Sequence, residues 1–220
     1  MKTKLTKQEK NWILYDVGNS AFTLLAATIL PIYFNYIAGK QGLSDVQYLA
    51  YWGYAVSIAT LLTALAGPVF GTVADTKGYK KPVFTIALGI GTIASVALGF
   101  AKYWLAFLVV FVIAQVGYSV TLVFYDSMLV DVTLEDRMDE ISSQGYAWGY
   151  IGSCVPFVIC LLVVLNAGKI GITMETAMMV SFVIITVWWV IITLPFLKTY
   201  HQKYYVQKNQ HAFSQSFKRI

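Results

Sequence analysis

The chain has 220 residues, of which 58% are hydrophobic and only 12% are charged, whereas a soluble domain carries roughly a quarter charged residues. This composition excludes an ordinary water-soluble domain. The formal net charge of +5 fits attraction of basic loops to anionic lipid and requires no nucleic-acid partner. We therefore predict an all-α integral membrane protein whose main partner is the lipid bilayer.

The predicted elements follow from stretches that lack Asp, Glu, Lys, Arg and His. A basic N-terminal tail covers residues 1–11, a six-helix transmembrane domain covers residues 12–197, and a basic tail covers residues 198–220. The transmembrane domain contains six uncharged stretches, and each of them is long enough to cross a hydrocarbon core of about 30 Å as a helix. The six predicted helices lie at about residues 12–39, 47–70, 82–101, 103–126, 145–168 and 176–197.

Basic residues are distributed unevenly between the two sets of loops. Placing the N-terminus inside puts all but three of the 16 lysines and arginines on the inner side, and leaves Lys40, Lys102 and Lys169 outside. Cytoplasmic loops near a membrane collect Lys and Arg. We therefore expect both termini to be cytoplasmic, in the plasma membrane of a bacterium.

Aromatic residues near the ends of the predicted helices are expected to lie at the headgroup level, where amphipathic rings settle. We interpret them as anchors of helix depth and not as a binding site. The residues concerned are Trp12, Tyr15, Tyr103, Trp104, Tyr125, Tyr146 and Trp148.

A loop motif lies between the second and third predicted helices. Gly71, Asp75 and Gly78 are followed by Lys80 and Lys81. A short reversing loop needs glycine where φ is positive or where backbones approach closely, which suits both glycines. Asp75 can accept hydrogen bonds from the first N–H groups of a neighbouring helix, and the lysines hold the loop on the inner side.

This loop resembles the signature of the major facilitator superfamily: Gly, three residues, Asp, two residues, Gly, then basic residues. The chain is also similar to the vacuole-effluxer-like branch of this superfamily, the autophagy-related permeases, at residues 12–22, Pro31, residues 33–34 and residues 145–152. Thr76 departs from the pattern, because most of the superfamily has a basic residue directly after the aspartate. This departure weakens a prediction of the local charge network but not of the fold.

The resemblance implies the N-terminal six-helix half of a major facilitator fold, built as two three-helix repeats. Such proteins have two halves joined by a cytoplasmic linker, and bind solute between them near the bilayer midplane. Residues 198–220 would begin that linker, and Asp75 would work at the interface with a second half. The expected identity is thus a truncated transporter or one member of a split pair.

Two functions are compatible with these features. The first is secondary active transport of a small solute, driven by a gradient because no nucleotide-binding motif is present. The alternative is a truncated or remnant membrane protein without transport activity, or a half-transporter that works only with a partner chain. Nothing in the sequence identifies the solute, and the resemblance alone suggests an amino acid.

Polar residues on one face of the first predicted helix, at i, i+3, i+4 and i+7, predict a solute pathway. Unsatisfied polar groups that face lipid cost several kcal/mol, so this face should meet a cavity or the bundle. Alternatively, Asp16 lies at the inner interface, bound to a lysine or a helix end. A polar patch on the fourth predicted helix corresponds to this polar face of the first helix. Alternatively, the patch serves only hydrogen bonding between helices. The candidate residues are Asp16, Asn19, Ser20, Thr23, Gln115 and Ser119.

Small residues on the fifth predicted helix indicate a packing surface. Gly145, Gly149 and Gly152 lie on one face, so another helix should approach closely there. In a six-helix chain this face would otherwise meet lipid, which fills such a groove poorly. We therefore expect a missing C-terminal half, or a second copy of the chain, to pack against it.

Residues 126–145 form the most acidic segment. A helix there would place residues 131, 135 and 139 on one face, which we interpret as solvated and not as a metal site. His201 and His211 are too far apart for a local zinc pair. Without a catalytic motif, we predict no enzyme, no catalytic residues, no cofactor and no metal.

Overall fold

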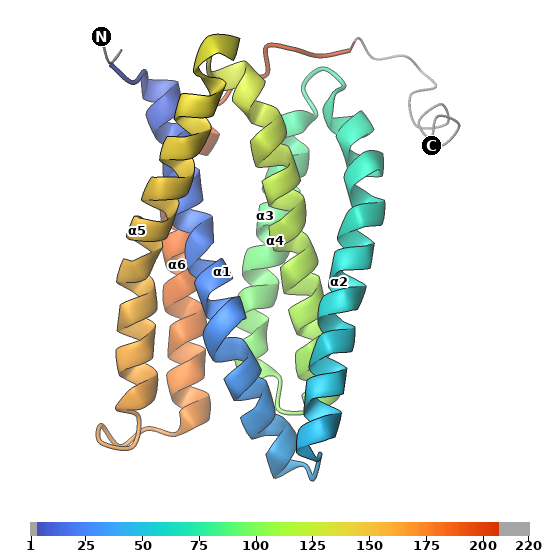
Figure 1. Cartoon of the computed structure of the whole chain (residues 1–220), viewed down its shortest axis with the longest axis vertical. Coiled ribbons are helices and arrows are strands. Elements are labelled where there is room, and N and C mark those ends of the chain that lie inside the picture. The colour runs from blue at the N-terminus through green and yellow to red at the C-terminus, as the bar shows by residue number, and fades with distance from the viewer. Residues whose placement is uncertain (1–3, 207–220) are drawn as a thin grey trace.

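The computed structural model describes residues 4–206, and within this range six long helices form an antiparallel bundle (Figure 1). All six are long and apolar enough to cross a membrane, so the predicted all-α membrane fold is confirmed. The elements are α1 Lys7–Lys40, α2 Asp45–Ala74, α3 Lys80–Ala97, η1 Leu98–Phe100, α4 Trp104–Val132, η2 Glu135–Arg137, α5 Met138–Leu165 and α6 Met174–Thr199.

The helices form two groups in Figure 1. In one group α1 packs on α5 and α6, and in the other α4 packs on α2 and α3, while α1 crosses toward α2 at the bottom of the view. The first three and the last three helices are therefore interleaved and do not form separate layers. We call the end where α1 begins and α6 ends the terminal end, which lies at the top of Figure 1.

Local sequence determines where the first two helices begin. Thr6 accepts a hydrogen bond from the backbone N–H of Glu9, whose side chain accepts one from the N–H of Thr6. Ser44 and Gln47 form the same reciprocal cap on α2. Such capping boxes satisfy N–H groups that a helix start leaves unpaired. As a result, α1 begins at Lys7, ahead of its uncharged stretch.

Aromatic side chains from α1, α4 and α6 fill the core of the bundle. The rings of Trp12 and Tyr125 stack with centroids 4.0 Å apart. Phe22 contacts both Trp189 and Tyr118, with centroid distances of 5.7 and 5.2 Å. Trp12 and Tyr125 are buried, so their rings pack against other helices inside the bundle, and their depth at the headgroup level stays a prediction.

Glycines bring the helices close together at two contacts. A Cβ added to Gly117 of α4 would lie 2.6 Å from the backbone nitrogen of Gly91 in α3. On α5, a Cβ added to Gly145 would lie 3.0 Å from the ring of Trp12, and one added to Gly149 would lie 3.0 Å from Ser20. Small residues of this kind allow membrane helices to pack backbone against backbone.

The glycine face of α5 therefore packs on α1 of the same chain. A Cβ added to Gly152 would overlap the side chain of Val17. The expectation that this face would meet lipid unless a second half or a second copy covered it is wrong. The sequence did not reveal this, because spacing defines a face of one helix but not which neighbour it meets.

The outer surface of the bundle is formed mainly by α2 and α5. In the apolar 18-residue segment that marks each helix as a membrane span, 6% of the segment is buried in α2 and 22% in α5, whereas 50% is buried in α1 and in α4. Large apolar side chains such as Leu61 and Leu65 of α2 and Val155 and Leu162 of α5 are exposed. These two helices therefore offer the faces that lipid or further helices contact.

The α3 and α4 contact leads to a stability prediction. We expect Gly117→Ala to lower the free energy of unfolding by about 1–3 kcal/mol, the usual cost of overpacking, because the methyl group would force the backbone of α3 away. Thermal unfolding of the purified protein in detergent measures this. Gly89→Ala is the control on α3, since its Cβ would meet nothing within 4 Å. Equal unfolding temperatures for both variants would contradict the close contact.

Candidate functional site

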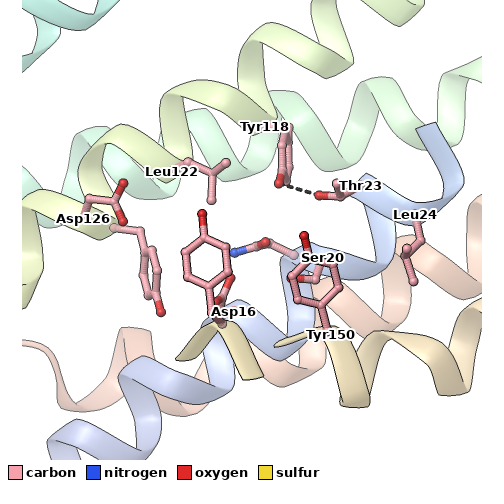
Figure 2. Close-up of a pocket in the computed structure, with 11 residues that line it drawn as sticks. Asp16, Ser20, Thr23, Leu24, Tyr118, Leu122, Asp126 and Tyr150 are labelled. Atoms are coloured by element: carbon pink, nitrogen blue, oxygen red, sulfur yellow. Dashed lines mark hydrogen bonds between the residues drawn. The ribbon is translucent and has the colours of Figure 1, made fainter. Parts of the chain in front are cut away.

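A polar cavity of about 150 Å³ lies between α1, α4 and α5 (Figure 2). Its α1 residues lie about 14–26 Å along the helix from Lys7 at 1.5 Å per residue. The cavity therefore extends from near the terminal end to about the middle of α1. The lining residues are Asp16, Asn19, Ser20, Thr23, Leu24, Tyr118, Leu122, Tyr125, Asp126, Tyr146 and Tyr150.

The structure places all four candidate residues of α1 in this lining. Figure 2 shows Asp16, Ser20 and Thr23 projecting from α1 toward α4. The hydroxyl groups of Thr23 and Tyr118 are hydrogen bonded to each other. Asp16 is 9% exposed and forms no ion pair within residues 4–206. The alternative in which a lysine holds Asp16 is therefore not what the structure has.

Buried neighbours set the rotation of α1 that turns Asp16 toward the cavity. The indole N–H of Trp12 donates to a backbone carbonyl of α4 at 3.1 Å, and the Tyr15 hydroxyl donates to Thr121 at 2.6 Å. On the opposite wall, Gly149 leaves room for the carboxylate, since an added Cβ would lie 3.1 Å from Asp16 Cγ. The aromatic residues orient the carboxylate, and the glycine accommodates it.

Two buried polar atoms in the lining form no hydrogen bond of good geometry among the described residues, although the Asn19 side chain lies next to the Asp16 carboxylate. They are Nδ2 of Asn19, a residue that is 1% exposed, and the hydroxyl of Tyr125, a residue that is 3% exposed. Leaving a buried donor unpaired costs about 1–3 kcal/mol, and such groups are rare in folded proteins. A bound ligand or water in the cavity would satisfy both atoms.

Sequence reasoning missed the residues that α4 and α5 contribute. The sequence predicts Asp126 at the boundary between the fourth helix and the acidic segment, and Tyr125 and Tyr146 at the headgroup level. In the structure α4 continues to Val132, so Asp126 lies inside a helix and lines the cavity. The detectable pattern was Tyr118, Leu122, Tyr125 and Asp126 at i, i+4, i+7 and i+8, which share one helix face.

Gln115 and Ser119 do not line this cavity. Both are half-buried and precede Leu122 and Asp126 at helical spacing, on the same face of α4. Gln115 lies farther from the terminal end than the cavity residues of α4, whereas Ser119 directly follows Tyr118 but is not part of the lining. The structure therefore brings the α1 candidates together but not the α4 candidates with them.

The acidic segment is not one helical face. The chain becomes extended at Thr133, the end cap of α4, and α5 begins only at Met138. Residues 131, 135 and 139 therefore do not line up, and Asp131 is 1% exposed. The prediction of a solvated face is wrong for Asp131.

Asp131 is the centre of a buried network at the terminal end. Its carboxylate pairs with Lys80 Nζ at 3.2 Å and accepts a 2.6 Å hydrogen bond from the Tyr200 hydroxyl. The backbone N–H groups of Lys203 and Tyr204 donate to its other oxygen, each at 2.9 Å. Burial and the bond to Asp131 raise the pKa of Tyr200 well above its ordinary value. Lys80 is 3% exposed, so it anchors α3 to α4 inside the protein.

The loop motif has a mixed outcome. Gly78 has a φ of +82°, as its predicted role in the turn requires. Gly71 lies inside α2 without a positive φ and would meet nothing within 4 Å as alanine, so both reasons given for a glycine there are wrong. Asp75 caps the end of α2 with its side chain exposed, and Lys81 is half-buried.

Residues 200–206 lie against this loop. Val206 pairs with Thr76 as a short parallel bridge, in which its N–H donates to the Asp75 carbonyl at 2.8 Å. The side chain of Gln202 accepts a 2.9 Å hydrogen bond from the N–H of Gly78. The first part of the predicted tail is thus held on the loop, while its remainder, including His211, lies outside the described residues.

Comparison with known proteins identifies the family. The family described as "Vacuole effluxer Atg22 like" matches residues 44–133 and 130–220. The chain belongs to this family. The predicted resemblance to the vacuole-effluxer-like branch of the major facilitator superfamily is confirmed.

Three relatives agree with this assignment. An uncharacterized MFS-type transporter of Bacillus subtilis, YxiO, is 39% identical over 225 residues, which cover 100% of this chain and 53% of the relative. Multidrug resistance protein MdtG of Yersinia enterocolitica is 36% identical over 92 residues, 41% of this chain and 21% of MdtG. An uncharacterized protein of Aquifex aeolicus is 24% identical over 161 residues, 72% of this chain and 40% of that protein.

These relatives confirm the half fold of the major facilitator superfamily and place the chain among membrane transport proteins in general. The chain spans about half the length of YxiO and less of the other two.

The buried pair of Lys80 and Asp131 leads to a second stability prediction. We expect Asp131→Asn to lower the free energy of unfolding by about 3–5 kcal/mol, because Lys80 would be left buried without its counter-charge. Chemical denaturation in detergent measures the loss, and adding Lys80→Met should recover part of it. Glu175→Gln is the control, since it removes an exposed pair with Lys40 and should cost at most about 1 kcal/mol. An equal loss in Asp131→Asn and Glu175→Gln would contradict the buried network.

Proposed function

We propose that this protein performs secondary active transport of a small solute, and that the cavity between α1, α4 and α5 forms part of the solute pathway. The observation that carries the proposal is the pair of unpartnered buried atoms of Asn19 and Tyr125 beside the carboxylate of Asp16. Polar groups inside membrane helices are costly and mark pathways. Family membership supports transport in general.

A second six-helix half or a partner chain completes the pathway in this proposal. Substrate sites in major facilitator proteins lie between two halves, and the cavity here opens between three helices of one half. The exposed faces of α2 and α5 are suited to contact the completing helices. The competing proposal is a membrane protein that keeps the fold and transports nothing. For the transport proposal, the family resemblance suggests an amino acid as the first solute to test.

The loop between α2 and α3 has a conformational role in this proposal. Asp75 exposes its side chain at the terminal end, where a completing half could contact it. Gly78 supplies the turn, and Lys80 holds the start of α3 on α4 through Asp131. Such a loop can change partners between transport states while the bundle stays intact. Gly71 and Lys81 belong to the same segment.

The pathway proposal predicts the effect of a change at Asp16. We expect Asp16→Asn to reduce the uptake rate by at least about tenfold, since a charged hydrogen bond contributes about 1.5–3 kcal/mol, while the amount of protein in the membrane stays the same. Uptake of labelled amino acids and amines by cells producing the protein measures this. Asp139→Asn is the control, because Asp139 is exposed and outside the cavity.

The result also separates the two functions. Unchanged uptake in Asp16→Asn would remove the cavity from the pathway. Accumulation no greater than in cells without the protein would favour the protein that transports nothing.

The terminal end is cytoplasmic in our proposal, and the membrane is the plasma membrane of a bacterium. The uneven distribution of basic residues between the two ends supports this orientation. Lys77 lies at the terminal end, whereas Lys40 and Lys169 lie at the opposite end.

Thiol labelling tests the orientation. In a background without Cys154 and Cys160, an impermeant reagent added outside intact cells should label Lys40→Cys and Lys169→Cys but not Lys77→Cys. The reason is that only the first two positions would face the outside. Labelling of Lys77→Cys in permeabilised cells shows that this cysteine can react. The opposite pattern in intact cells would reverse the orientation.

A further inference from the structure

The cavity between α1, α4 and α5 has an unbalanced charge. Asp16 and Asp126 line it, and none of its 11 lining residues is a Lys, Arg or His. Neither carboxylate forms an ion pair within the described part of the chain. Because isolated charges are costly in a membrane bundle, a positive group in the cavity would stabilise both carboxylates.

Tyrosine rings supply a second attraction for a positive group. Tyr118, Tyr125, Tyr146 and Tyr150 line the same cavity. Tyr146 and Tyr150 follow each other by one turn of α5, with ring centroids 6.3 Å apart. A cation over the face of an aromatic ring gains about 0.5–2 kcal/mol. Organic ammonium groups are the ligands that such aromatic walls recognise.

The unpartnered atoms define a further property of the ligand. Nδ2 of Asn19 can only donate a hydrogen bond, whereas the hydroxyl of Tyr125 can donate or accept one. The Asp16 carboxylate, which interacts with this amide, is also the group that a bound cation would occupy, and a metal ion or a simple ammonium ion brings no further acceptor for Asn19. A ligand that carries a hydroxyl or carbonyl oxygen would supply this buried amide with an acceptor of its own.

We infer that the cavity binds a small organic cation, namely a protonated amine that also carries an uncharged hydrogen-bond acceptor. The inference names the solute class of the proposed transport and rests on that proposal. A zwitterionic amino acid fits less well, because its carboxylate would lie beside Asp16 and Asp126 with no basic side chain to offset the repulsion. The volume of about 150 Å³ favours a small molecule.

Matched pairs of amines and amino acids test the inference. Ethanolamine differs from serine, and ethylamine from alanine, only by the absent carboxylate. Titration calorimetry on the purified protein measures binding of all four. We expect ethanolamine to bind at least about tenfold more tightly than serine, as one charge-assisted hydrogen bond permits. It should also bind more tightly than ethylamine, which lacks a hydroxyl acceptor for Asn19.

Three variants connect the binding to the cavity. Asp126→Asn should weaken ethanolamine binding about tenfold. Asp139→Asn, which removes an exposed carboxylate outside the cavity, should leave it unchanged. Asn19→Leu should abolish the advantage of ethanolamine over ethylamine. Circular dichroism checks that each variant is folded.

The results that would contradict the cation assignment differ from those that would contradict the transport proposal. Serine binding as tight as ethanolamine binding, or no binding of either amine, would overturn the cation assignment. If the protein accumulates amino acids and Asp16→Asn abolishes that uptake, the proposed transport stands and the cation assignment falls. If the amines bind as expected and no labelled solute is accumulated, the cation site stands and the transport proposal falls.

Discussion

The polar face of α1 must be sheltered from lipid, and the rest of the structure depends on this constraint. Asp16 and Asn19 are buried although they lie in a helix that can cross a membrane, where unsatisfied polar groups are costly. The bundle meets the constraint by packing α4 and α5 around that face. The glycines of α5 allow this close packing, because any larger residue at Gly149 would press on Asp16.

The packing does not satisfy every polar group on this face of α1. Hydrogen bonds satisfy Tyr15 and Thr23, but Asn19 and Tyr125 keep unpaired atoms beside a cavity. The cavity therefore combines a buried aromatic support with polar atoms that are free to pair with a ligand or water.

The terminal end solves the same electrostatic problem with protein groups alone. Asp131 and Lys80 are buried together; Tyr200 donates to the carboxylate oxygen that pairs with Lys80, and two backbone N–H groups donate to the other oxygen. This network joins α3, α4 and the segment after α6. Its full satisfaction distinguishes it from the cavity, where the two carboxylates have no basic partner within residues 4–206.

Much could be predicted from the amino-acid sequence, because the bilayer restricts what a chain can do. Six uncharged stretches of membrane-spanning length required six helices, and the spacing of Asp16, Asn19, Ser20 and Thr23 placed them on one face of α1. Only the tertiary structure decided which helices meet that face. Asp126 joined the cavity because α4 extends past its uncharged stretch, and the α5 glycines met α1 because helix rotation and neighbour choice depend on packing of the whole bundle.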